Sequence, residues 1–316
     1  MLLTIILTSW KEEKTIAKAL QCLLDPKYSG FSGSIQLITV IPDELTQNAA
    51  RNFLAKFPVK NLSWESIKDP QKGKPFALNL AFKQAKAPYI LLTDGDVYLG
   101  KNAVSLLVSS IKQKGVGGVT GRPVASNSRS KIMGYYANLL ADAAHHKRTV
   151  TMGSNTAGHS LAFVSREPRF FVLSGYIMIL KNLKYRVPED CLSEDAYLSY
   201  YLHNQEYKLL YEPRATVQVK YATNLKDWFR QKLRSVGGYM QLWKYGVIKP
   251  ETKVRNFWKE LEYFWFPVRY SKNLAEFIWS LLLYPIRLFL WLKIFYEQRI
   301  LKKDFVSTWL RIESTK

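Results

Sequence analysis

The sequence predicts an α/β protein built on a mainly parallel sheet, followed by a helical region rich in aromatic and basic residues. Three observations lead to this fold class. Up to about residue 125, short β-rich runs alternate with helical patterns, so crossovers rather than tight hairpins join the strands. Polar segments follow several of these runs, and the composition changes beyond residue 223.

The first part of the chain alternates strands and helices. Strands are predicted at 2–8, 35–41, 62–67, 89–93 and 116–119. Helices are predicted at 13–24, 46–56, 74–86 and 101–113. Right-handed crossovers between such strands build a parallel sheet, which binds ligands at the carboxyl ends of its strands.

The middle of the chain is less regular and is predicted to complete the same domain as an α+β lobe. A helix is predicted around 131–146 and another from Ser193, with strand-like runs at 170–180 and 209–219. We therefore expect one domain over 1–222, with halves at 1–125 and 126–222, and a separate region over 223–316.

The C-terminal region has the composition of a membrane-surface segment. It holds most of the nine tryptophans, and Phe277–Tyr296 contains only Arg287 and Lys293 as charged residues. A spanning helix needs roughly 20 apolar residues, and an arginine at mid-span costs about 2.5 kcal/mol or more. We expect helices that lie in the headgroup plane, with packing on the protein's own core as the alternative.

The charge balance is strongly basic. Among 316 residues, 46 lysines and arginines oppose 25 acidic residues, which gives a formal charge of +21. Because nearly half of the residues are apolar, disorder is excluded as a description of the whole chain. Nucleic acid, an anionic membrane surface and phosphorylated substrates are the partners that such a charge favours.

The cysteines and the N-terminus indicate a reducing compartment. Cys22 and Cys191 show neither disulfide-framework nor zinc spacing. The apolar start of the chain is short, has no basic segment before it and runs into a charged segment. We interpret it as a buried strand rather than a secretory segment.

Asp94-Gly95-Asp96 is the first candidate site. It follows the apolar run Tyr89–Thr93, so both carboxylates are expected at a strand end. Carboxylate oxygens are the ligands that Mg²⁺ and Mn²⁺ prefer, and Gly95 allows a ligand to approach the backbone. The alternative is a solvated turn.

Two other groups of residues have a physical reading of their own. Lys74 and Asn79 lie near a predicted helix start, where a cation and free backbone N–H groups favour phosphate. Glu194 and Asp195 begin another helix and supply a carboxylate for proton transfer. The alternatives are an ordinary capped surface helix and acids that merely complement a helix dipole.

The order and spacing of these segments resemble the family-2 glycosyltransferases. The resemblance covers about residues 2–240 and is strongest at 72–96 and 193–215. Its motifs are Lys-Gly-Lys-Pro-Phe-Ala-Leu-Asn at 72–79, Ala-Pro-Tyr-Ile-Leu-Leu-Thr-Asp-Gly-Asp at 87–96, Glu-Asp-Ala-Tyr-Leu-Ser at 194–199 and Phe-Arg-Gln-Lys-Leu-Arg-Ser at 229–235.

The resemblance implies an A-type glycosyltransferase fold, with a nucleotide-binding half at 1–125 and an acceptor half at 126–222. It implies inverting transfer from a nucleoside-diphosphate sugar, with Asp195 as general base, Glu194 in support, and Mn²⁺ or Mg²⁺ on Asp96 and Asp94. The implied donor-binding residues are Thr8, Glu12, Asp43, Lys74, Asn79, Asp94, Gln231 and Arg234.

Two departures from the family pattern affect individual roles. Pro42-Asp43-Glu44 stands where the family often has paired aspartates, so Asp43 is the weaker contact to the base. Ser235 stands where a tryptophan is expected after Gln231 and Arg234. A guanidinium at Arg234 still suits a departing diphosphate, and the alternative is a basic helix face near lipid.

The sequence therefore favours an enzyme at the cytoplasmic face of a membrane. Its expected partners are a nucleotide-sugar donor, a glycan or lipid-linked acceptor and an anionic membrane surface, with no nucleic acid. Two alternatives stay open: a basic nucleic-acid-binding protein, which the charge of +21 suggests, and a catalytically inactive membrane scaffold with the same fold.

Overall fold

The computed structural model describes residues 2–151, 170–249, 263–301 and 313–315. The chain forms two compact units, which are described in turn. The first unit comprises Met1–Val124 and Lys147–Val219, and the second comprises Ala125–His146 and Lys220–Lys316.

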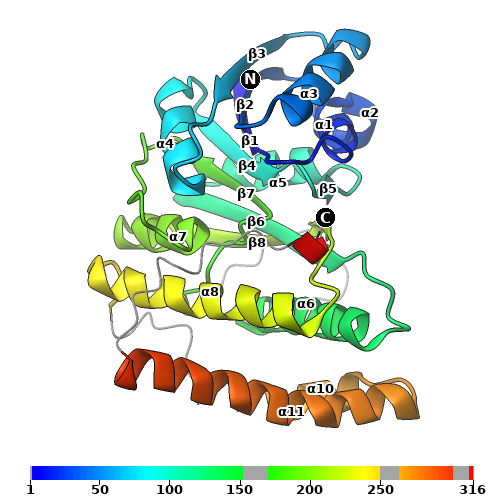
Figure 1. The fold of residues 1–316 in the computed structure, drawn as a ribbon. Coiled ribbons are helices and arrows are strands. Elements are labelled where there is room, and N and C mark those ends of the chain that lie inside the picture. The colour runs from blue at the N-terminus through cyan, green and yellow to red at the C-terminus, as the bar shows by residue number, and fades with distance from the viewer. Residues whose placement is uncertain (1, 152–169, 250–262, 302–312, 316) are drawn as a thin grey trace. The chain divides into compact units, whose positions relative to one another are not determined.

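The first unit is built around an eight-stranded sheet with the strand order β3-β2-β1-β4-β7-β6-β8-β5 (Figure 1). The strands are β1 (Leu2–Thr8), β2 (Ser34–Ile41), β3 (Leu62–Lys68), β4 (Tyr89–Asp94), β5 (Tyr98–Leu99), β6 (Val116–Ala125), β7 (Ile177–Lys181) and β8 (Lys208–Val219). The predicted strands of the first part of the chain all occur, and the α/β class is confirmed.

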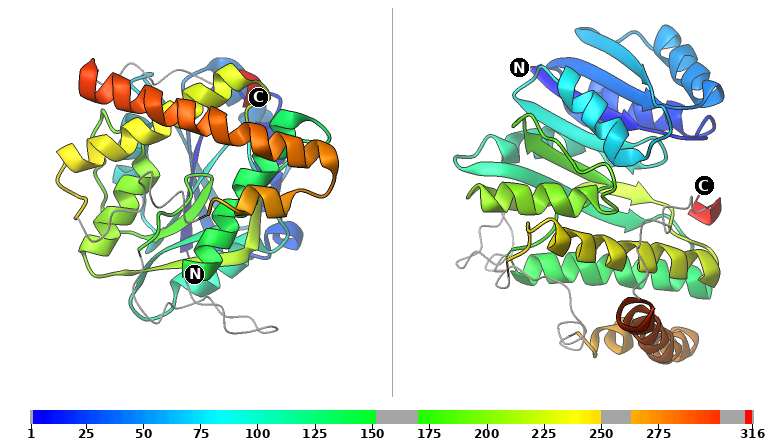
Figure 2. Two further views of the ribbon diagram at one scale, coloured as in Figure 1. Left: turned by 90° about the horizontal axis from the view of Figure 1, so that it is seen from below. Right: turned by 60° about the vertical axis from the view of Figure 1, so that its left-hand side comes forward.

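Strands β3, β2, β1 and β4 form the parallel half of this sheet. They are joined through α1 (Ile16–Leu24), α3 (Glu44–Lys56) and α4 (Lys74–Gln84). Because the strand order reverses between β1 and β4, right-handed crossovers place α4 on the face opposite to α1 and α3, as Figures 1 and 2 show. The reversal makes the carboxyl ends of β1 and β4 the expected ligand site.

The other half of the sheet is antiparallel. Strand β7 runs antiparallel to both β4 and β6, and β5 runs antiparallel to β8. The remaining helices of the first unit are α2 (Pro26–Ser29), α5 (Ala103–Ile111) and α7 (Glu194–Asn204). The sheet is therefore mixed, because β7, which comes from the less regular middle of the chain, runs opposite to both β4 and β6.

The burial of each strand explains its sequence pattern. Strand β1, Leu-Leu-Thr-Ile-Ile-Leu-Thr, is covered on both faces, and six of its seven residues are buried. Its sequence is therefore a nearly continuous apolar run, interrupted only by threonine. Strand β3, Leu-Ser-Trp-Glu-Ser-Ile-Lys, lies at the sheet edge, and exposed polar residues recur along it.

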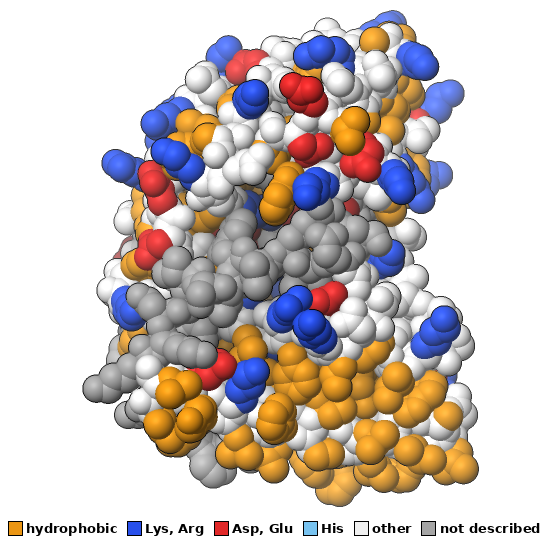
Figure 3. All heavy atoms as spheres, in the orientation of Figure 1, with side chains coloured by type: hydrophobic (Ala, Val, Ile, Leu, Met, Phe, Trp, Pro, Cys, Tyr) orange, Lys and Arg blue, Asp and Glu red, His pale blue; other side chains and the backbone are white. Residues whose placement is uncertain are grey.

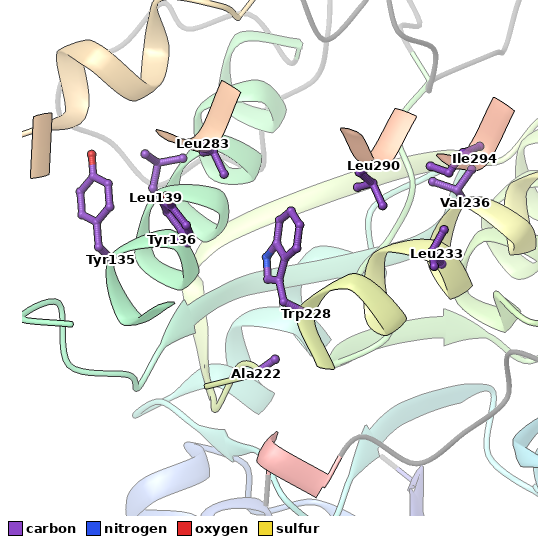
Figure 4. Packing of buried hydrophobic residues seen from close by; sticks show 10 residues of the cluster. All are labelled: Tyr135, Tyr136, Leu139, Ala222, Trp228, Leu233, Val236, Leu283, Leu290 and Ile294. Carbon is purple, nitrogen blue, oxygen red and sulfur yellow. The ribbon is translucent and has the colours of Figure 1, made fainter. Parts of the chain in front are cut away.

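The second unit is helical. Its main elements are α6 (Ile132–Thr151, of which the residues up to His146 belong here), α8 (Leu225–Lys244), α10 (Phe266–Tyr270) and α11 (Leu274–Phe295), followed by a π-helical turn at Tyr296–Ile300 and a 3-10 turn at Glu313–Thr315. Figure 4 shows its apolar core, to which α6, α8 and α11 all contribute. This core consists of Tyr135, Tyr136, Leu139, Ala222, Trp228, Leu233, Val236, Leu283, Leu290 and Ile294.

This division differs from the domains expected from the sequence. The second part of the second unit begins at Lys220, close to the expected boundary at 222, but Ala125–His146 also belongs to this unit. Tyr135, Tyr136 and Leu139 of that segment are almost fully buried against side chains of α8 and α11. Sequence order alone predicts that this segment belongs to the acceptor half.

Truncation of a core leucine tests the central sheet. Leu91 on β4 is 0% exposed, whereas Leu45 on α3 is 69% exposed. We expect Leu91→Ala to lower the free energy of unfolding by about 2–5 kcal/mol, because it removes buried methyl groups and leaves a cavity. Leu45→Ala is the control, with an expected change within about 0.5 kcal/mol in the same denaturant titration. Equal losses would contradict the placement of Leu91 in the core.

Candidate active site

A polar cluster lies at the carboxyl ends of β1 and β4, inside the first unit. Thr8 and Asp94 are partners in the parallel register of these strands. The Thr8 hydroxyl donates to Asp94 Oδ1 at 2.7 Å, and the Gly95 amide donates to the Thr8 carbonyl at 3.0 Å. The two strand ends therefore hold Asp94 in one orientation, as the sequence predicted for a strand-end carboxylate.

Gly95 is packed against the loop that follows β1. The Ser9 hydroxyl donates to Glu12 Oε2 at 2.6 Å, and the Glu12 side chain is only 5% exposed. A Cβ atom on residue 95 would overlap both Ser9 and Glu12. The glycine between the two aspartates thus lets Glu12, a predicted donor contact, lie directly beside the backbone between Asp94 and Asp96.

Asp43 caps a helix and anchors the same loop. Its Oδ1 accepts from the Thr46 amide at 2.9 Å, and its Oδ2 accepts from the Lys11 amide at 2.7 Å. Burial acts to raise the pKa of the Asp43 carboxyl, but these amide hydrogen bonds outweigh it and the pKa is lowered. The carboxylate of Asp43 is therefore engaged in shaping the loop, and its predicted contact to the donor base stays a prediction.

Lys74 links two acidic residues that are far apart in sequence. It is the first residue of α4, which follows Gly73 at a φ of 104°. Its ammonium lies 2.7 Å from Asp94 Oδ1 and 3.2 Å from Glu194 Oε1. The Lys74 side chain is 24% exposed. Although burial alone would lower the pKa of Lys74, the two carboxylates raise it, so the ammonium stays charged.

Asp195 is held beside this ion-pair network at the start of α7. Its Oδ1 accepts from the Ala196 amide at 2.8 Å, and its Oδ2 accepts from the Gly175 amide at 3.2 Å. Burial and the neighbouring charge of Glu194 raise the pKa of Asp195 to about 6, against the opposing effect of the amides and Lys74. A carboxylate with such a pKa is a better proton acceptor near neutral pH than an ordinary aspartate.

The amide of Gly175 is a contribution that the sequence did not identify. A Cβ atom on residue 175 would lie 3.2–3.4 Å from atoms of the Asp195 side chain, so the glycine permits the close approach. Gly175 lies in Ser174-Gly175-Tyr176, just before β7. Gly175 and Asp195 are 20 positions apart, with β7 between them, and no local sequence pattern predicts that two such residues form a hydrogen bond. Only the tertiary structure shows this contact.

Asn79 is engaged in a structural contact. Its side-chain amide donates to the Val187 carbonyl at 2.7 Å, and its Oδ1 accepts from the Val187 amide at 2.8 Å. The side chain thus pairs both backbone groups of one buried residue, as a neighbouring strand would. This contact gives Asn79 a role other than the predicted contact to donor phosphate.

Gln231 and Arg234 lie on α8 of the second unit, whereas the cluster described above lies in the first unit. Both are half-buried there. Their predicted roles as donor contacts stay predictions.

The carboxylates at this site suit a hard divalent cation that is held partly by the protein and partly by a bound substrate. Within the described ranges, no group of three or more His, Cys, Asp or Glu side chains is placed to hold a metal ion. Asp94 and Asp96 supply two half-buried carboxylates. Two carboxylates are the number that Mg²⁺ commonly uses beside nucleotides. It binds one or two of them, while phosphate oxygens and water complete the coordination.

Known proteins resemble this chain over most of its length. The family described as "Glycosyltransferase like family 2" matches residues 2–238. The poly-beta-1,6-N-acetyl-D-glucosamine synthase of Staphylococcus aureus (strain COL) is 25% identical over 295 residues, which are 91% of this chain and 64% of the synthase. The chain therefore spans less than two thirds of the length of that relative.

Two solved structures share the fold. The mannosyltransferase PcManGT from Pyrobaculum calidifontis, in complex with GDP-Man and Mn²⁺, has a TM-score of 0.61 at 14% identity, over 95% of this chain and 88% of that chain. S. aureus TarS 1-349, in complex with UDP-GlcNAc, has a TM-score of 0.50 at 16% identity, over 75% and 66%. Together with the family match, they confirm the A-type glycosyltransferase fold.

Removal of the Asn79 amide tests its structural contact. We expect Asn79→Ala to lower the free energy of unfolding by about 1–3 kcal/mol, because the buried amide and carbonyl of Val187 lose their partners. Asn52→Ala, at an exposed position on α3, is the control, with an expected change within about 0.5 kcal/mol. Chemical denaturation of both variants is the measurement. If the two variants were equally stable, the contacts to Val187 would have no structural weight.

Proposed function

Because this chain belongs to the glycosyltransferase-like family 2, we propose that it transfers a sugar, with inversion, from a nucleoside-diphosphate sugar to a cell-envelope acceptor. The acceptor is a growing polysaccharide or a lipid-linked glycan at the cytoplasmic face of a membrane. The S. aureus relative is named for synthesis of a polysaccharide of N-acetylglucosamine, which supports this acceptor class. The complexes of PcManGT and TarS with nucleotide sugars support the donor class.

The observation that carries the proposal is the ion-pair network of Lys74. One ammonium contacts both Asp94, at the end of the donor-side strand β4, and Glu194, the neighbour of Asp195. Donor and acceptor chemistry therefore meet in one cluster of the first unit. A nucleic-acid-binding protein or an inactive scaffold has no need for this arrangement, and membership in an enzyme family favours catalysis over both.

The proposed roles follow from the contacts of each side chain. Asp195 accepts the proton of the acceptor hydroxyl. At the same time the oxygen of this hydroxyl bonds to the anomeric carbon of the sugar, and the bond between that carbon and the diphosphate breaks. Glu194 raises the proton affinity of Asp195 through its charge. Lys74 adds positive charge beside Asp94, where the negative diphosphate departs.

Asp94 and Asp96 would hold Mg²⁺ or Mn²⁺ together with the diphosphate of the donor. When bound, the cation neutralises charge that develops on the leaving diphosphate. The complex of PcManGT with GDP-Man and Mn²⁺ supports a divalent cation in this fold. Thr8 and Glu12 complete the donor side as proposed contacts, since both flank the loop and strand that present Asp94.

A thermal-shift panel tests the donor and the metal together. UDP-, GDP- and dTDP-sugars are added to the full chain with and without Mn²⁺. We expect one nucleotide class to raise the melting temperature only when Mn²⁺ is present, because a ligand that binds the folded state stabilises it. The same shift is expected to disappear in Asp96→Ala. A shift that persists without metal, or in Asp96→Ala, would contradict the assignment of the metal site.

The pH dependence of transfer tests the base. Since the pKa of Asp195 is about 6, kcat is expected to rise with pH through about 6 and then level off, because only the carboxylate accepts a proton. Glu194→Gln removes the charge that raises this pKa, so the acid limb should move to lower pH. Asp195→Asn should reduce kcat by about 100- to 10,000-fold on the plateau above pH 6 and should abolish the acid limb.

The control for Glu194→Gln is Glu189→Gln, which removes an acid of the same type at an exposed position. It should leave the acid limb in place. An acid limb that stays unchanged in Glu194→Gln would exclude the proposed influence of Glu194 on Asp195, and full activity of Asp195→Asn would exclude Asp195 as the base.

A further inference from the structure

The two sides of α11 differ in character. This helix of 22 residues has a mean hydropathy of 1.6 over its most apolar window, and only 22% of that window is buried. Judged by length and composition alone, the helix is long and apolar enough to cross a membrane. Within the second unit, however, one side of the helix packs on protein along its whole length. Among the described residues, the side chains on its other side are mostly exposed.

The covered side carries polar anchors at its start. Glu276 is 4% exposed and forms a paired contact with Arg129, whose Nε and Nη2 lie 2.6 and 2.7 Å from the two carboxylate oxygens. The Arg129 guanidinium also stacks over the Tyr270 ring at 4.2 Å. One turn further on, the Ser280 hydroxyl lies 2.6 Å from the Tyr135 hydroxyl. These contacts determine which side of α11 faces the protein.

The rest of the covered side is apolar. Leu283, Leu290 and Ile294 continue the same stripe at helical spacing and are at most 3% exposed (Figure 4). They pack into the core that α6 and α8 line, including Trp228 and Leu233. From Glu276 to Ile294 the helix is therefore attached lengthwise to this unit.

The open side is apolar as well. Figure 3 shows hydrophobic side chains gathered over α10 and α11. Six of the most exposed are Trp265 (64%), Leu281 (46%), Leu288 (51%), Phe289 (59%), Leu292 (59%) and Phe295 (59%). On α11, Leu281, Leu288, Leu292 and Phe295 recur every three to seven residues and Phe289 is next to Leu288, which places all five in one stripe on one side of the helix. An apolar surface of this extent indicates an interaction site.

We infer that α11 binds an anionic lipid bilayer lengthwise, with this stripe in the acyl boundary and the helix axis in the membrane plane. The inference names the membrane contact that the proposed function leaves general, and it rests on that function only in placing the acceptor at a membrane. It excludes a membrane-crossing role for α11.

The neighbouring helix rules out crossing. Trp228, Leu233 and Val236 of α8 share the core with α11, so α8 accompanies α11 at whatever depth it takes. Along α8 lie Lys226, Asp227, Arg230, Lys232, Arg234 and Lys244. A crossing α11 would carry several of these charges into hydrocarbon, which strongly disfavours that orientation. An in-plane helix keeps them outside the acyl region.

The charges near α11 favour anionic lipid over a second copy of the chain. Four cations, Arg269, Lys272, Arg287 and Lys293, lie on the helix or on its approach, against the acids Glu276, which is paired with Arg129, and Glu297 just after the helix. A second copy related by twofold symmetry would bring a second set of these predominantly positive charges to the same interface. Anionic headgroups attract these cations instead, as they attract the basic residues of interfacial helices in other proteins.

Vesicle flotation tests the contact with the full chain. The probes are vesicles of phosphatidylcholine with and without phosphatidylglycerol, and no donor is present. We expect flotation with the phosphatidylglycerol vesicles and a partition coefficient at least about tenfold lower for Leu292→Glu, which corresponds to about 1.4 kcal/mol. Leu45→Glu, an exposed leucine of the first unit at 69% exposure, should bind like the unchanged chain.

Absence of flotation of the unchanged chain, or equal loss in both variants, would overturn the inference. Sedimentation of a stable dimer that Leu292→Glu dissociates would also overturn it, because the stripe would then bind a second copy. Melting temperatures with and without a nucleotide sugar report folding and donor binding separately. Failure of the proposed transferase function is therefore distinguishable from failure of membrane binding.

Labelling of the two ends of α11 tests its orientation. Single cysteines are placed at Lys272 and Ile300, the latter 61% exposed, and a membrane-impermeant maleimide is added to sealed membrane vesicles from an expressing host. The native Cys22 and Cys191 are buried and serve as the background. An in-plane helix gives the same protection at both ends. Protection of one end and labelling of the other would show that α11 crosses the membrane.

Discussion

The ammonium of Lys74 is the contact on which the candidate active site depends. It neutralises Asp94 and Glu194, which come from a strand end and a helix start 100 residues apart in the chain. Desolvation of several carboxylates in one place is costly unless a cation lies among them. Lys74 therefore offsets part of the repulsion between acidic residues that come from distant parts of the first unit and share one cluster.

The same electrostatic balance sets different properties for neighbouring acids. Asp94 accepts a hydrogen bond from the Thr8 hydroxyl and contacts the Lys74 ammonium. Asp195 has two amide hydrogen bonds, yet burial and Glu194 raise its pKa to about 6. The two carboxylates thus have different surroundings, as the two proposed roles of holding a cation and accepting a proton require.

The second unit shows how buried polar contacts orient a helix that is apolar nearly all round. Hydrophobicity alone would allow α11 to rotate about its axis, since apolar residues occur on both sides. The bidentate contact of Glu276 with Arg129 and the contact of Ser280 with Tyr135 are satisfied in one rotation only. A polar pair thereby determines which leucines form the core and which remain open to a partner.

The sequence by itself determined the alternation of strands and helices, the placement of Asp94 at a strand end and the presence of Glu194 and Asp195 at a helix start. These features follow from the hydrophobic period and from the polar residues at the ends of elements, which are local properties. It did not reveal that Asn79 pairs with Val187, that Asp43 anchors the loop after β1, or that Ala125–His146 belongs with the C-terminal helices. Each of these depends on groups distant in the chain, whose approach no local pattern encodes. Only the tertiary structure decided which side of α11 is covered, because that choice follows from a salt bridge formed across 147 positions.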